Sequence, residues 1–318
     1  MSDWNRVRVM AIVKAADAIM DIRLLALDGQ PLPVADAGSH IDVRLPNGLI
    51  RQYSVHRYDP SGGSYSIGVG LSEPSRGGSA FIHAYLRVGD MLEVSAVRNN
   101  FPLERNAGTY LFIAGGIGIT PILSMIRWCD ANDKPWQLLY CVRSRSRAAY
   151  IEHLPRGGKL VFHTDDENAG RPDLQAFIRQ ANSTDQLYCC GPAPLMNAVR
   201  DVAQAYLPSD KVHFELFSAP QLSAPEKQQN NSFVVELARS GMEVTVPANT
   251  SLLDALEGAG IMVPYSCREG LCRTCECRVL AGEIDHRDYV LSDEERASNA
   301  VILQCVSRAK TSRLVLDI

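Results

Sequence analysis

The sequence has no excess of positive charge, no uninterrupted apolar segment of membrane-spanning length and no disulfide-type cysteine framework. Its 32 Lys and Arg residues against 36 Asp and Glu give a formal net charge of −4, which argues against a nucleic-acid-binding protein because such proteins usually carry a basic face. One apolar stretch, Thr109–Ile126, is interrupted by glycines and a proline, which favours a strand, a turn and a helix over a bilayer span. Residues 1–6 lack the plan of a signal peptide, so we expect a cytoplasmic protein without a membrane segment.

The nine cysteines do not follow the spacings of a short secreted disulfide scaffold, so we expect reduced thiols. Cys267, Cys272 and Cys275 follow the spacing C-x4-C-x2-C, and Cys305 comes after a long gap. This is the plant-type ferredoxin arrangement, in which four thiolates hold a 2Fe–2S cluster. Structural zinc is the alternative, because it also binds four thiolates, although it usually takes two C-x2-C pairs. Cys277 is expected to be a small buried residue rather than a ligand.

A chain of 318 residues is too long for one ordinary core and predicts two or three domains. Residues 1–105 contain short alternating runs of β-branched residues separated by turn residues, such as Val7–Val13, His40–Leu45 and Tyr65–Val69. Such runs predict an antiparallel Greek-key β-barrel, interrupted by a short helix near Ala80–Leu86.

In residues 106–217, apolar strands alternate with helical segments. Strands are expected at Tyr110–Ala114, Trp136–Val142, Lys159–His163, Gln186–Cys190 and Val212–Phe217, and helices at Pro121–Cys129 and Pro194–Tyr206. The alternation predicts an α/β domain with a parallel sheet covered on both faces.

A polar stretch with two prolines, residues 218–231, is interpreted as an interdomain linker. Residues 232–318 predict a compact α+β domain around the cysteine loop. Its expected elements are a hairpin at Phe233–Ala238 and Met242–Val246, a capped helix near Ser251–Glu257, and late strands at Val301–Cys305 and Leu314–Ile318.

The segment Gly115-Gly116-Ile-Gly118-Ile-Thr120-Pro121 follows an apolar strand and opens a helix. Glycines at such a turn let the backbone approach a pyrophosphate, and the helix N-terminus favours its negative charge. Pro121 stands where the third glycine of the standard dinucleotide fingerprint would be, so glycines at a tight turn explain the motif nearly as well. A second turn, Cys190-Gly191-Pro192, ends a later strand, and the carboxyl ends of parallel strands face one crevice. The two turns together favour a nucleotide site.

Two barrel segments, Arg51-Gln52-Tyr53-Ser54 and Arg76-Gly77-Gly78-Ser79, carry residue types that suit a flavin. Arginine supplies a forked donor for phosphate, tyrosine a flat ring for stacking, and serine a hydroxyl for a ring edge. Taken alone, the first segment also fits a strand with a solvated arginine and a cross-strand tyrosine.

The order Arg-x-Tyr-Ser, Gly-Gly-x-Gly-x-Thr-Pro, Cys-Gly-Pro and C-x4-C-x2-C…C resembles the ferredoxin-reductase superfamily. More narrowly, the chain resembles the phthalate dioxygenase reductase and vanillate demethylase reductase group over essentially its whole length, including Arg98–Leu103 and His213–Phe217. The resemblance implies a flavin-binding barrel, a nicotinamide-binding α/β domain and a β-grasp 2Fe–2S ferredoxin domain. Because relatives with the ferredoxin domain at the C-terminus use FMN, it implies FMN, with FAD as the alternative.

The resemblance also implies roles for individual residues. The flavin site would comprise Arg51, Gln52, Tyr53, Ser54, Gly68, Val69, Gly78, Ser79 and Phe217. The nicotinamide dinucleotide would contact Gly115, Gly116, Gly118, Thr120, Pro121, Cys190, Gly191 and Pro192. The cluster ligands would be Cys267, Cys272, Cys275 and Cys305. Only Ser54 and Cys190 are nominated as catalytic, near-reaction residues, because the cofactors carry the chemistry and no general acid or base is required.

The choice between NADH and NADPH depends on the segment Tyr140–Arg147, which contains three arginines and no acidic residue. An acidic residue there usually binds the adenosine ribose, whereas arginines suit a 2′-phosphate. The resemblance favours NADH, and arginines also bind a pyrophosphate or face solvent. We therefore expect NADH, with NADPH as the alternative. The acidic trio Asp165–Glu167 is interpreted as a solvated loop, and the histidines as structural residues.

These features predict a reductase in which NADH delivers a hydride to FMN, which passes single electrons to the 2Fe–2S cluster. The resemblance implies a separate oxygenase component as acceptor, of the Rieske type, acting on an aromatic or similar acid. One alternative is a reductase for a cytochrome P450 or another ferredoxin-dependent acceptor. Another is a zinc-stabilised binding module on a vestigial nucleotide fold. The oligomeric state stays open, with a monomer favoured.

Overall fold

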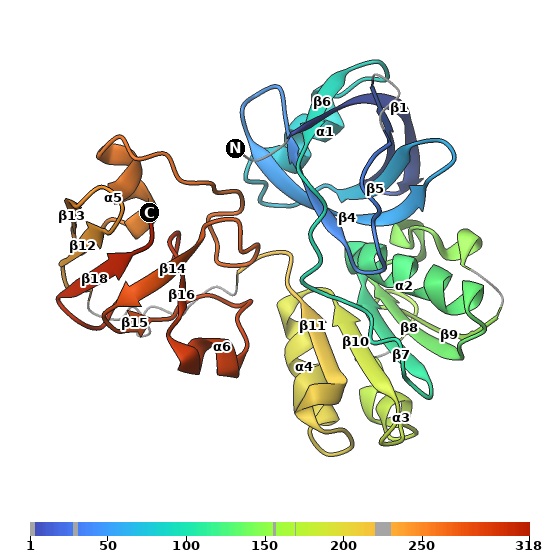
Figure 1. Cartoon of the computed structure of the whole chain (residues 1–318). Helices are drawn as coiled ribbons and strands as arrows, with labels where there is room; N and C mark the ends of the chain where they lie inside the picture. Colours follow the sequence, from blue (N-terminus) through green and yellow to red (C-terminus); the bar gives the residue numbers. More distant parts are fainter. Residues whose placement is uncertain (1–3, 28–30, 155–156, 169, 220–229) are drawn as a thin grey trace. The chain divides into compact units, whose positions relative to one another are not determined.

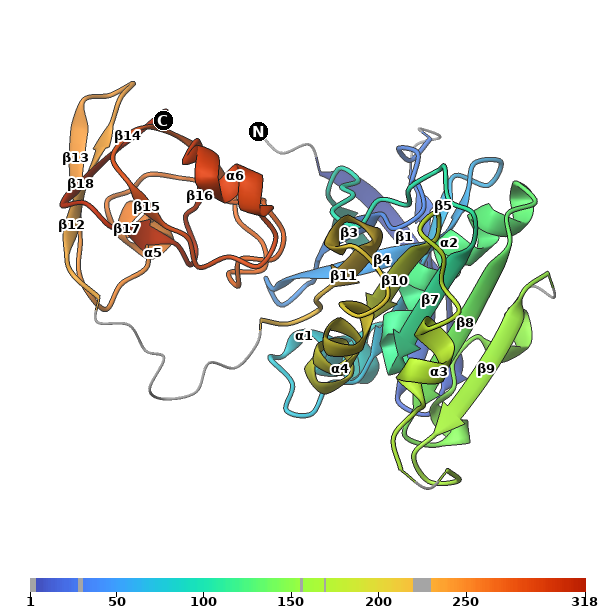
Figure 2. The same ribbon diagram turned by 90° about the horizontal axis from the view of Figure 1, so that it is seen from below.

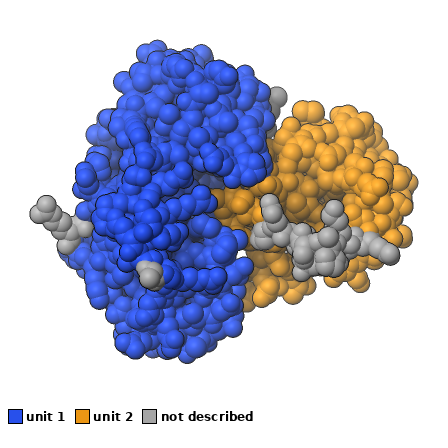
Figure 3. All heavy atoms as spheres, turned by 180° about the vertical axis from the view of Figure 1, so that it is seen from behind, with its two compact units in different colours: residues 1–215 blue, residues 216–318 orange. Residues whose placement is uncertain are grey.

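The computed structural model describes residues 4–27, 31–154, 157–168, 170–219 and 230–318. The chain divides into two compact units, residues 1–215 and residues 216–318, which Figure 3 colours separately. The predicted barrel and parallel sheet both lie in the first unit, and the cysteine loop lies in the second. Most of the predicted linker, residues 218–231, lies outside the described residues.

Six antiparallel strands close a barrel in the order β1-β2-β5-β4-β3-β6 (Figure 1), which confirms the predicted fold class of this part. Alternate side chains such as Val7, Val9, Ile22 and Leu24 point inward and are fully buried, as the two-residue period of a strand requires. The elements are β1 (Asn5–Ala16), β2 (Ile19–Ala26), β3 (His40–Arg44), β4 (Ile50–Asp59), β5 (Ser64–Gly70), α1 (Gly78–Tyr85) and β6 (Met91–Val94).

The rest of the first unit is a parallel sheet in the order β11-β10-β7-β8-β9. Helix α2 covers the face nearer the barrel and contacts β4, and α3 and α4 lie on the other face (Figures 1 and 2). The sheet and its coverage on both faces confirm the predicted α/β architecture. The elements are β7 (Tyr110–Gly115), α2 (Ile119–Ala131), β8 (Trp136–Val142), β9 (Lys159–Thr164), α3 (Leu174–Ile178), β10 (Gln186–Cys190), α4 (Ala193–Ala203) and β11 (Val212–Glu215).

Helix α2 begins at Ile119, two residues earlier than the sequence pattern predicts. A 3-10 turn, η1 (Gly116–Gly118), runs directly into it. Pro121 therefore lies inside the first helical turn, where backbone N–H groups have no intrahelical acceptor and the missing donor of proline breaks no hydrogen bond. The turn after β7 is thus a continuous glycine-rich entry into a helix.

The second unit has a five-stranded sheet in the order β13-β12-β18-β14-β16 with a small β15-β17 pair, the predicted β-grasp arrangement. Ser251 caps α5 by accepting a hydrogen bond from the Asp254 backbone N–H, at 3.0 Å, as the capping pattern predicts. The elements are β12 (Phe233–Leu237), β13 (Met242–Val246), α5 (Leu252–Gly258), β14 (Glu276–Ala281), β15 (Ile284–Asp285), α6 (Asp293–Ser298), β16 (Val301–Leu303), β17 (Arg308–Ala309) and β18 (Arg313–Leu316).

Across the part of the chain that the structure describes, no helix is both long enough and apolar enough to cross a membrane.

Candidate functional site

The glycine turn after β7 and the Cys-Gly-Pro turn after β10 pack directly against each other. A Cβ atom on Gly115 would collide with Pro192 and Gly191, and one on Gly118 would overlap the carbonyl group of Cys190. The backbone of Gly116 is left-handed, with a φ of +54°, a conformation that glycine adopts at little cost. Glycine is therefore required in this turn both by the close approach of the two turns and by the left-handed backbone of Gly116. An isolated tight turn would require only the second.

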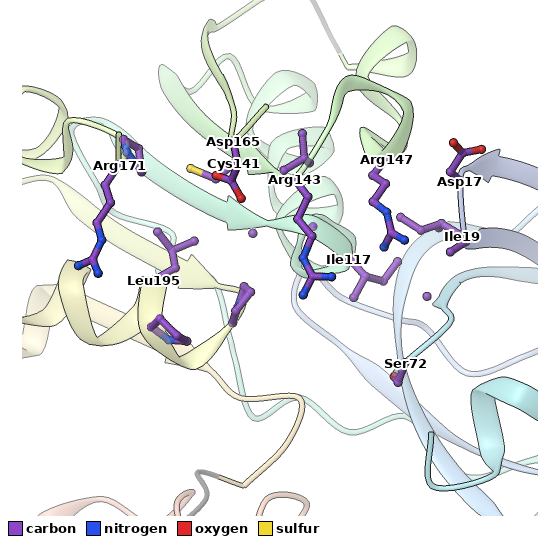
Figure 4. Close-up of a pocket in the computed structure, with 18 of the residues that line it drawn as sticks. Asp17, Ile19, Ser72, Ile117, Cys141, Arg143, Arg147, Asp165, Arg171 and Leu195 are labelled. Atoms are coloured by element: carbon purple, nitrogen blue, oxygen red, sulfur yellow. The ribbon is translucent and has the colours of Figure 1, made fainter. Parts of the chain in front are cut away.

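A cavity of about 480 Å³ opens beside these two turns (Figure 4). The barrel contributes Asp17, Ile19 and Ser72 to its wall, and the two turns contribute Gly115, Gly116 and Pro192. Three arginines, Arg143, Arg147 and Arg171, also line it and outnumber its two aspartates by one. Figure 4 shows Arg143 in the middle of the cavity wall, with Leu195 of α4 on one side and Arg147 on the other. Guanidinium groups beside open backbone turns suit a pyrophosphate, so the cavity fits a dinucleotide.

All three residues of the acidic trio are exposed, as expected for a solvated loop, but two of them have further contacts. Asp165 follows β9 and lines the cavity, although its side chain is exposed. Glu167 instead forms a two-pronged ion pair with Arg145, with N–O distances of 3.2 and 2.8 Å. This pair lowers the pKa of Glu167 and raises that of Arg145. Arg145 is not among the residues that line the cavity. The sequence pattern could not separate Arg145 from Arg143 and Arg147, because only the fold shows which of them face the cavity.

Cys190 ends β10 and is fully buried. Burial raises the pKa of its thiol well above the ordinary value, and the nearby Glu215 carboxylate adds to this. Cys190 is therefore a neutral thiol, which suits a packing or contact role rather than a nucleophile. Cys190, Gly191, Gly118, Thr120 and Pro121 adjoin the cavity-lining turns but do not line the cavity themselves. Their cofactor roles stay predictions.

Arg51 on β4 lies against the N-terminus of α1. A Cβ atom on Gly78 would collide with the Arg51 side chain, whose Nη2 donates to the carbonyl oxygen of Arg76 at 2.6 Å. Helix α1 has Gly77, which has no side chain, as its N-cap residue and no acidic residue in its first turn, although the Ala80 N–H donates to Oγ of Ser75 at 3.4 Å. Its N–H groups and the guanidinium therefore converge where an anion would be stabilised, and the predicted residues fit a flavin phosphate.

The remaining predicted flavin residues of the first unit lie on or near the same barrel strands. Ser54 is buried on β4, and the buried Nε2 of Gln52 has no hydrogen-bond partner within the described residues. Burial raises the pKa of Tyr53, so its hydroxyl stays protonated. The other members are Gly68 and Val69 on β5, Ser79 in α1, and Phe217, which is exposed and belongs to the second unit. Their contacts with a flavin stay predictions.

The four predicted cluster ligands gather in the second unit. The Cys267 thiol interacts with those of Cys272 and Cys305, and Cys305 also interacts with Cys275. Hydrogen bonds from Cys272 and then Cys305 lower the pKa of Cys267. The described residues contain no group of three or more His, Cys, Asp or Glu side chains placed to hold a single metal ion. A 2Fe–2S cluster has a different requirement, two thiolates for each of two irons.

Hydrogen-bond donors surround the cysteine loop. The backbone N–H groups of Glu269 and Leu271 donate to the Cys267 sulfur at 3.3 and 3.5 Å, and the Thr274 hydroxyl donates to the Cys272 sulfur at 3.1 Å. Donors of this kind stabilise anionic sulfur around an iron–sulfur cluster. The donor set therefore fits a 2Fe–2S cluster. Cys277 lies on β14 in the hydrophobic core, as expected for a buried residue without a ligand role.

Sequence reasoning did not single out two charged groups in this region. Glu215 ends β11, and its buried Oε2 has no hydrogen-bond partner within the described residues. Arg171 lines the cavity from the loop before α3. Glu215 lies in the segment His213–Phe217, which resembles the family but carried no assigned role for this residue, and Arg171 belongs to no short motif with a known spacing.

Two family models match the chain. An oxidoreductase NAD-binding domain matches residues 112–201, and a 2Fe-2S iron-sulfur cluster binding domain matches residues 235–310. The chain therefore carries an NAD-binding domain and a 2Fe–2S domain, as the sequence predicts.

Curated relatives match this chain over nearly the whole length of both proteins. The chain is 43% identical to phenoxybenzoate dioxygenase subunit beta of Ectopseudomonas oleovorans, covering 98% of this chain and 96% of the relative. It is 41% identical to vanillate O-demethylase oxidoreductase of Pseudomonas sp. (strain HR199 / DSM 7063), with 98% of both chains covered. It is 37% identical to phthalate dioxygenase reductase of Burkholderia cepacia, covering 98% of this chain and 97% of the relative.

Solved structures agree with these relatives. The structure of phthalate dioxygenase reductase, described as a modular structure for electron transfer from pyridine nucleotides to [2Fe-2S], matches with a TM-score of 0.72 and 37% identity over 99% of this chain and 98% of that one. An intact type IV self-sufficient cytochrome P450 monooxygenase matches with a TM-score of 0.90 and 38% identity over 99% of this chain, which spans 41% of that chain. By sequence identity, coverage, domain content and fold, this chain is an oxidoreductase that belongs to the phthalate dioxygenase reductase family.

Proposed function

We propose that this protein takes electrons from NADH through FMN to its 2Fe–2S cluster and delivers them singly to a separate oxygenase component in the cytoplasm. The acceptor would be a Rieske-type oxygenase acting on an aromatic or similar acid. The relatives named for phthalate, vanillate and phenoxybenzoate support this substrate class. Residues 1–105 would form the FMN domain, 106–217 the NAD domain, 218–231 the linker and 232–318 the ferredoxin domain.

The main support for the proposal is that four cysteine thiols lie close together in a chain that also contains a cavity fitting a dinucleotide. A 2Fe–2S cluster carries one electron at a time, so it cannot accept a hydride directly. A flavin, when bound, accepts a hydride and releases its electrons one by one. The predicted flavin residues of the barrel supply this missing link in the same chain.

The protein's own residues would bind and orient these groups. The glycine turn and the arginines of the cavity would hold the pyrophosphate of the nucleotide. Arg51 and the N-terminus of α1 would hold the flavin phosphate, and the Glu269 and Leu271 N–H groups would stabilise the Cys267 thiolate. Cys267, Cys272, Cys275 and Cys305 would bind the irons. Cys190, as a neutral buried thiol, would pack beside the nicotinamide and take no proton.

The cavity also favours NADH over NADPH. The carboxylate of Asp165 lies in the cavity wall, where it would accept hydrogen bonds from ribose hydroxyls and repel a 2′-phosphate. Arg145, a candidate partner for a 2′-phosphate, is already paired with Glu167. NADPH would bind well only if the attraction of its 2′-phosphate to Arg143, Arg147 or Arg171 exceeded the repulsion from Asp165.

A reductase that serves a cytochrome P450 is the second candidate, because this chain matches part of a self-sufficient P450 with 38% identity. Reconstitution separates the two. The purified protein is combined with a Rieske-type oxygenase or with a P450, and substrate turnover is measured as the acceptor concentration rises. The true acceptor would show turnover that saturates with its concentration.

The first experiment is anaerobic reduction of the purified protein by NADH and by NADPH, monitored by absorbance and electron paramagnetic resonance. A red-brown protein with flavin bands, two irons per chain and a signal of the reduced cluster after NADH supports the proposal. A colourless protein that contains zinc contradicts it and favours the binding-module alternative. Faster reduction by NADPH contradicts only the choice of nucleotide.

A further inference from the structure

Four side chains outside the predicted cofactor residues form a polar network between the barrel and the parallel-sheet half of the first unit. The ring atom Nε2 of His56 on β4 lies 2.6 Å from Oδ1 of Asp21 on β2. On the other side of the ring, Nη1 of Arg127 on α2 lies 3.0 Å from Nδ1 of His56 and also donates to the His56 backbone carbonyl oxygen. The Tyr150 hydroxyl donates to the same Asp21 oxygen at 3.1 Å. His56 is only 3% exposed, so the network is shielded from water at its centre.

A β-bulge explains how a barrel residue reaches the helix. Between β4 and β5, Val55 pairs with Ile67 but Arg57 pairs with Ser66, which leaves one extra residue, His56, on β4. Bulges redirect side chains and interrupt a ladder locally, and they often lie at barrel rims. The imidazole therefore leaves the regular barrel surface and faces α2.

The partners fix the protonation state of His56. A guanidinium only donates hydrogen bonds, so Nδ1, which faces Arg127, must be the acceptor and Nε2 must carry the hydrogen that Asp21 accepts. Burial lowers the pKa of His56, the Asp21 carboxylate opposes this, and Arg127 and Arg57 lower the pKa further. At neutral pH, the imidazole is therefore a neutral bridge between a carboxylate and a guanidinium.

The network reaches the place where the predicted flavin strand meets the predicted nicotinamide turn. A Cβ atom on Gly68 would lie 2.6 Å from both the Tyr150 hydroxyl and Cγ2 of Thr120. Tyr150 itself adopts a left-handed backbone, with a φ of +62°, which is rare for a bulky residue and persists only where surrounding contacts enforce it. Its ring also packs on His56, with ring centroids 4.8 Å apart.

We propose that His56 is a positioning residue for hydride transfer, because it ties Asp21 of the barrel to Arg127 of α2 and so fixes β5 against the glycine turn. The inference rests on the proposed flavin and nicotinamide sites. Neither His56 nor its partners Asp21, Arg127 and Tyr150 are among the described residues that line the dinucleotide cavity. Loss of the bridge should therefore misplace the two cofactors relative to each other without removing a contact to the nucleotide. A misplacement of about 1 Å is enough to slow a reaction roughly 100-fold.

The test compares His56→Leu and His56→Gln with wild type in the flavin-loaded holoprotein, with His153→Leu as a matched control at an exposed histidine. Rapid anaerobic mixing with NADH gives the dissociation constant for NADH and the limiting rate of flavin reduction. His56→Leu should lower the limiting rate roughly 10- to 100-fold while the dissociation constant stays within about twofold. His56→Gln should recover most of the rate, because its amide N–H can still donate to Asp21. His153→Leu should match wild type.

A pH profile separates positioning from simple packing. Asp21, Arg57, Arg127 and Tyr150 are the ionisable groups that face His56 from the elements packed around it. Protonation of His56 at acidic pH removes the Nδ1 acceptor and leaves Arg127 bound only to the His56 carbonyl oxygen, so the wild-type limiting rate should fall there. The His56→Gln variant should lose that inflection. Independently of turnover, ¹⁵N NMR of the histidine rings should show His56 as the neutral Nε2–H tautomer at pH 7.

An unchanged limiting rate in flavin-loaded His56→Leu overturns the proposal, as does a Nδ1–H or charged His56. A loss of rate that His56→Gln does not restore also overturns it. If His56→Leu yields no folded protein, Tyr150→Phe provides the test, since it removes only the hydroxyl bound to Asp21. An unchanged limiting rate there again overturns the proposal. A wild-type protein whose flavin NADH does not reduce contradicts the proposed function instead.

Discussion

Cys190 and Glu215 lie opposite each other in register on the adjacent parallel strands β10 and β11. Each is the last residue of its strand, at the carboxyl edge of the sheet where the glycine turn also lies. Burial raises the pKa of the Glu215 carboxyl group to about 8. Near neutral pH, the sheet edge beside the nucleotide cavity therefore holds a neutral thiol and a largely protonated carboxyl group, which a bound dinucleotide meets as uncharged neighbours.

Glu215→Gln should make thermal stability less dependent on pH. A carboxyl group whose pKa is raised on folding contributes stability that is fully present below its unfolded-state pKa and is lost as pH rises through about 8. The wild-type Tm should therefore decline from about pH 5 to pH 9 relative to that of the variant. Calorimetry of both proteins across this range measures the difference. Parallel curves would show that Glu215 is not a buried protonated acid.

Ala and Asn should destabilise the protein in a different order at Gly116 than at Gly118, although both glycines lie in one turn. Gly116 needs a left-handed backbone but has open space around its Cα, so Gly116→Asn should be milder than Gly116→Ala, which costs roughly 1–2 kcal/mol. At Gly118 the constraint is space, because a Cβ atom would overlap the Cys190 carbonyl group. Gly118→Ala should therefore lower the free energy of unfolding by about 1–3 kcal/mol, and Gly118→Asn should lower it at least as much. Urea unfolding gives the four values. The same Ala–Asn ranking at both positions would contradict this account of the turn.

Asp165→Asn should relax the preference for NADH. Removing a negative charge from a wall that also carries three arginines should raise kcat/KM for NADPH roughly tenfold or more and lower it modestly for NADH. The neighbouring Asp166→Asn is the control, because Asp166 is exposed and does not line the cavity. Equal changes in both variants would indicate a general charge effect rather than discrimination at Asp165.

The sequence predicted the buried sheet strands best. Trp136–Val142 and Gln186–Cys190 match β8 and β10 at both ends, because strands buried on both faces are continuous apolar runs bounded by turn residues. Helix α6 was not predicted, since Asp293–Ser298 has no apolar stripe and no buried residue. Its signal was the capping box formed by Ser292 and Glu295, which the structure contains.

The candidate site was predictable only where it consists of local motifs. The glycine turn and the cysteine loop are short segments whose spacing alone indicates their chemistry. The bridge from Asp21 through His56 to Arg127 joins residues far apart in the chain and depends on a bulge in β4. Such a contact has no local pattern, because the register of two strands and the docking of a helix create it together. Asp165 is similar, since only the sheet order brings the end of β9 to the cavity.

The central claim is that electrons enter at the flavin and leave through the four-cysteine cluster. Its most direct test is the ratio of two NADH-dependent activities in Cys272→Ser, with Cys277→Ala as the matched control at a buried cysteine outside the ligand set. Ferricyanide can take electrons from the flavin, whereas the oxygenase component must take them from the cluster. We expect Cys272→Ser to keep ferricyanide reduction within about twofold and to lose roughly 100-fold or more of oxygenase-coupled turnover, while Cys277→Ala keeps both. Oxygenase-coupled turnover that survives in Cys272→Ser, or a loss of both activities in protein that still holds its flavin, would contradict the claim.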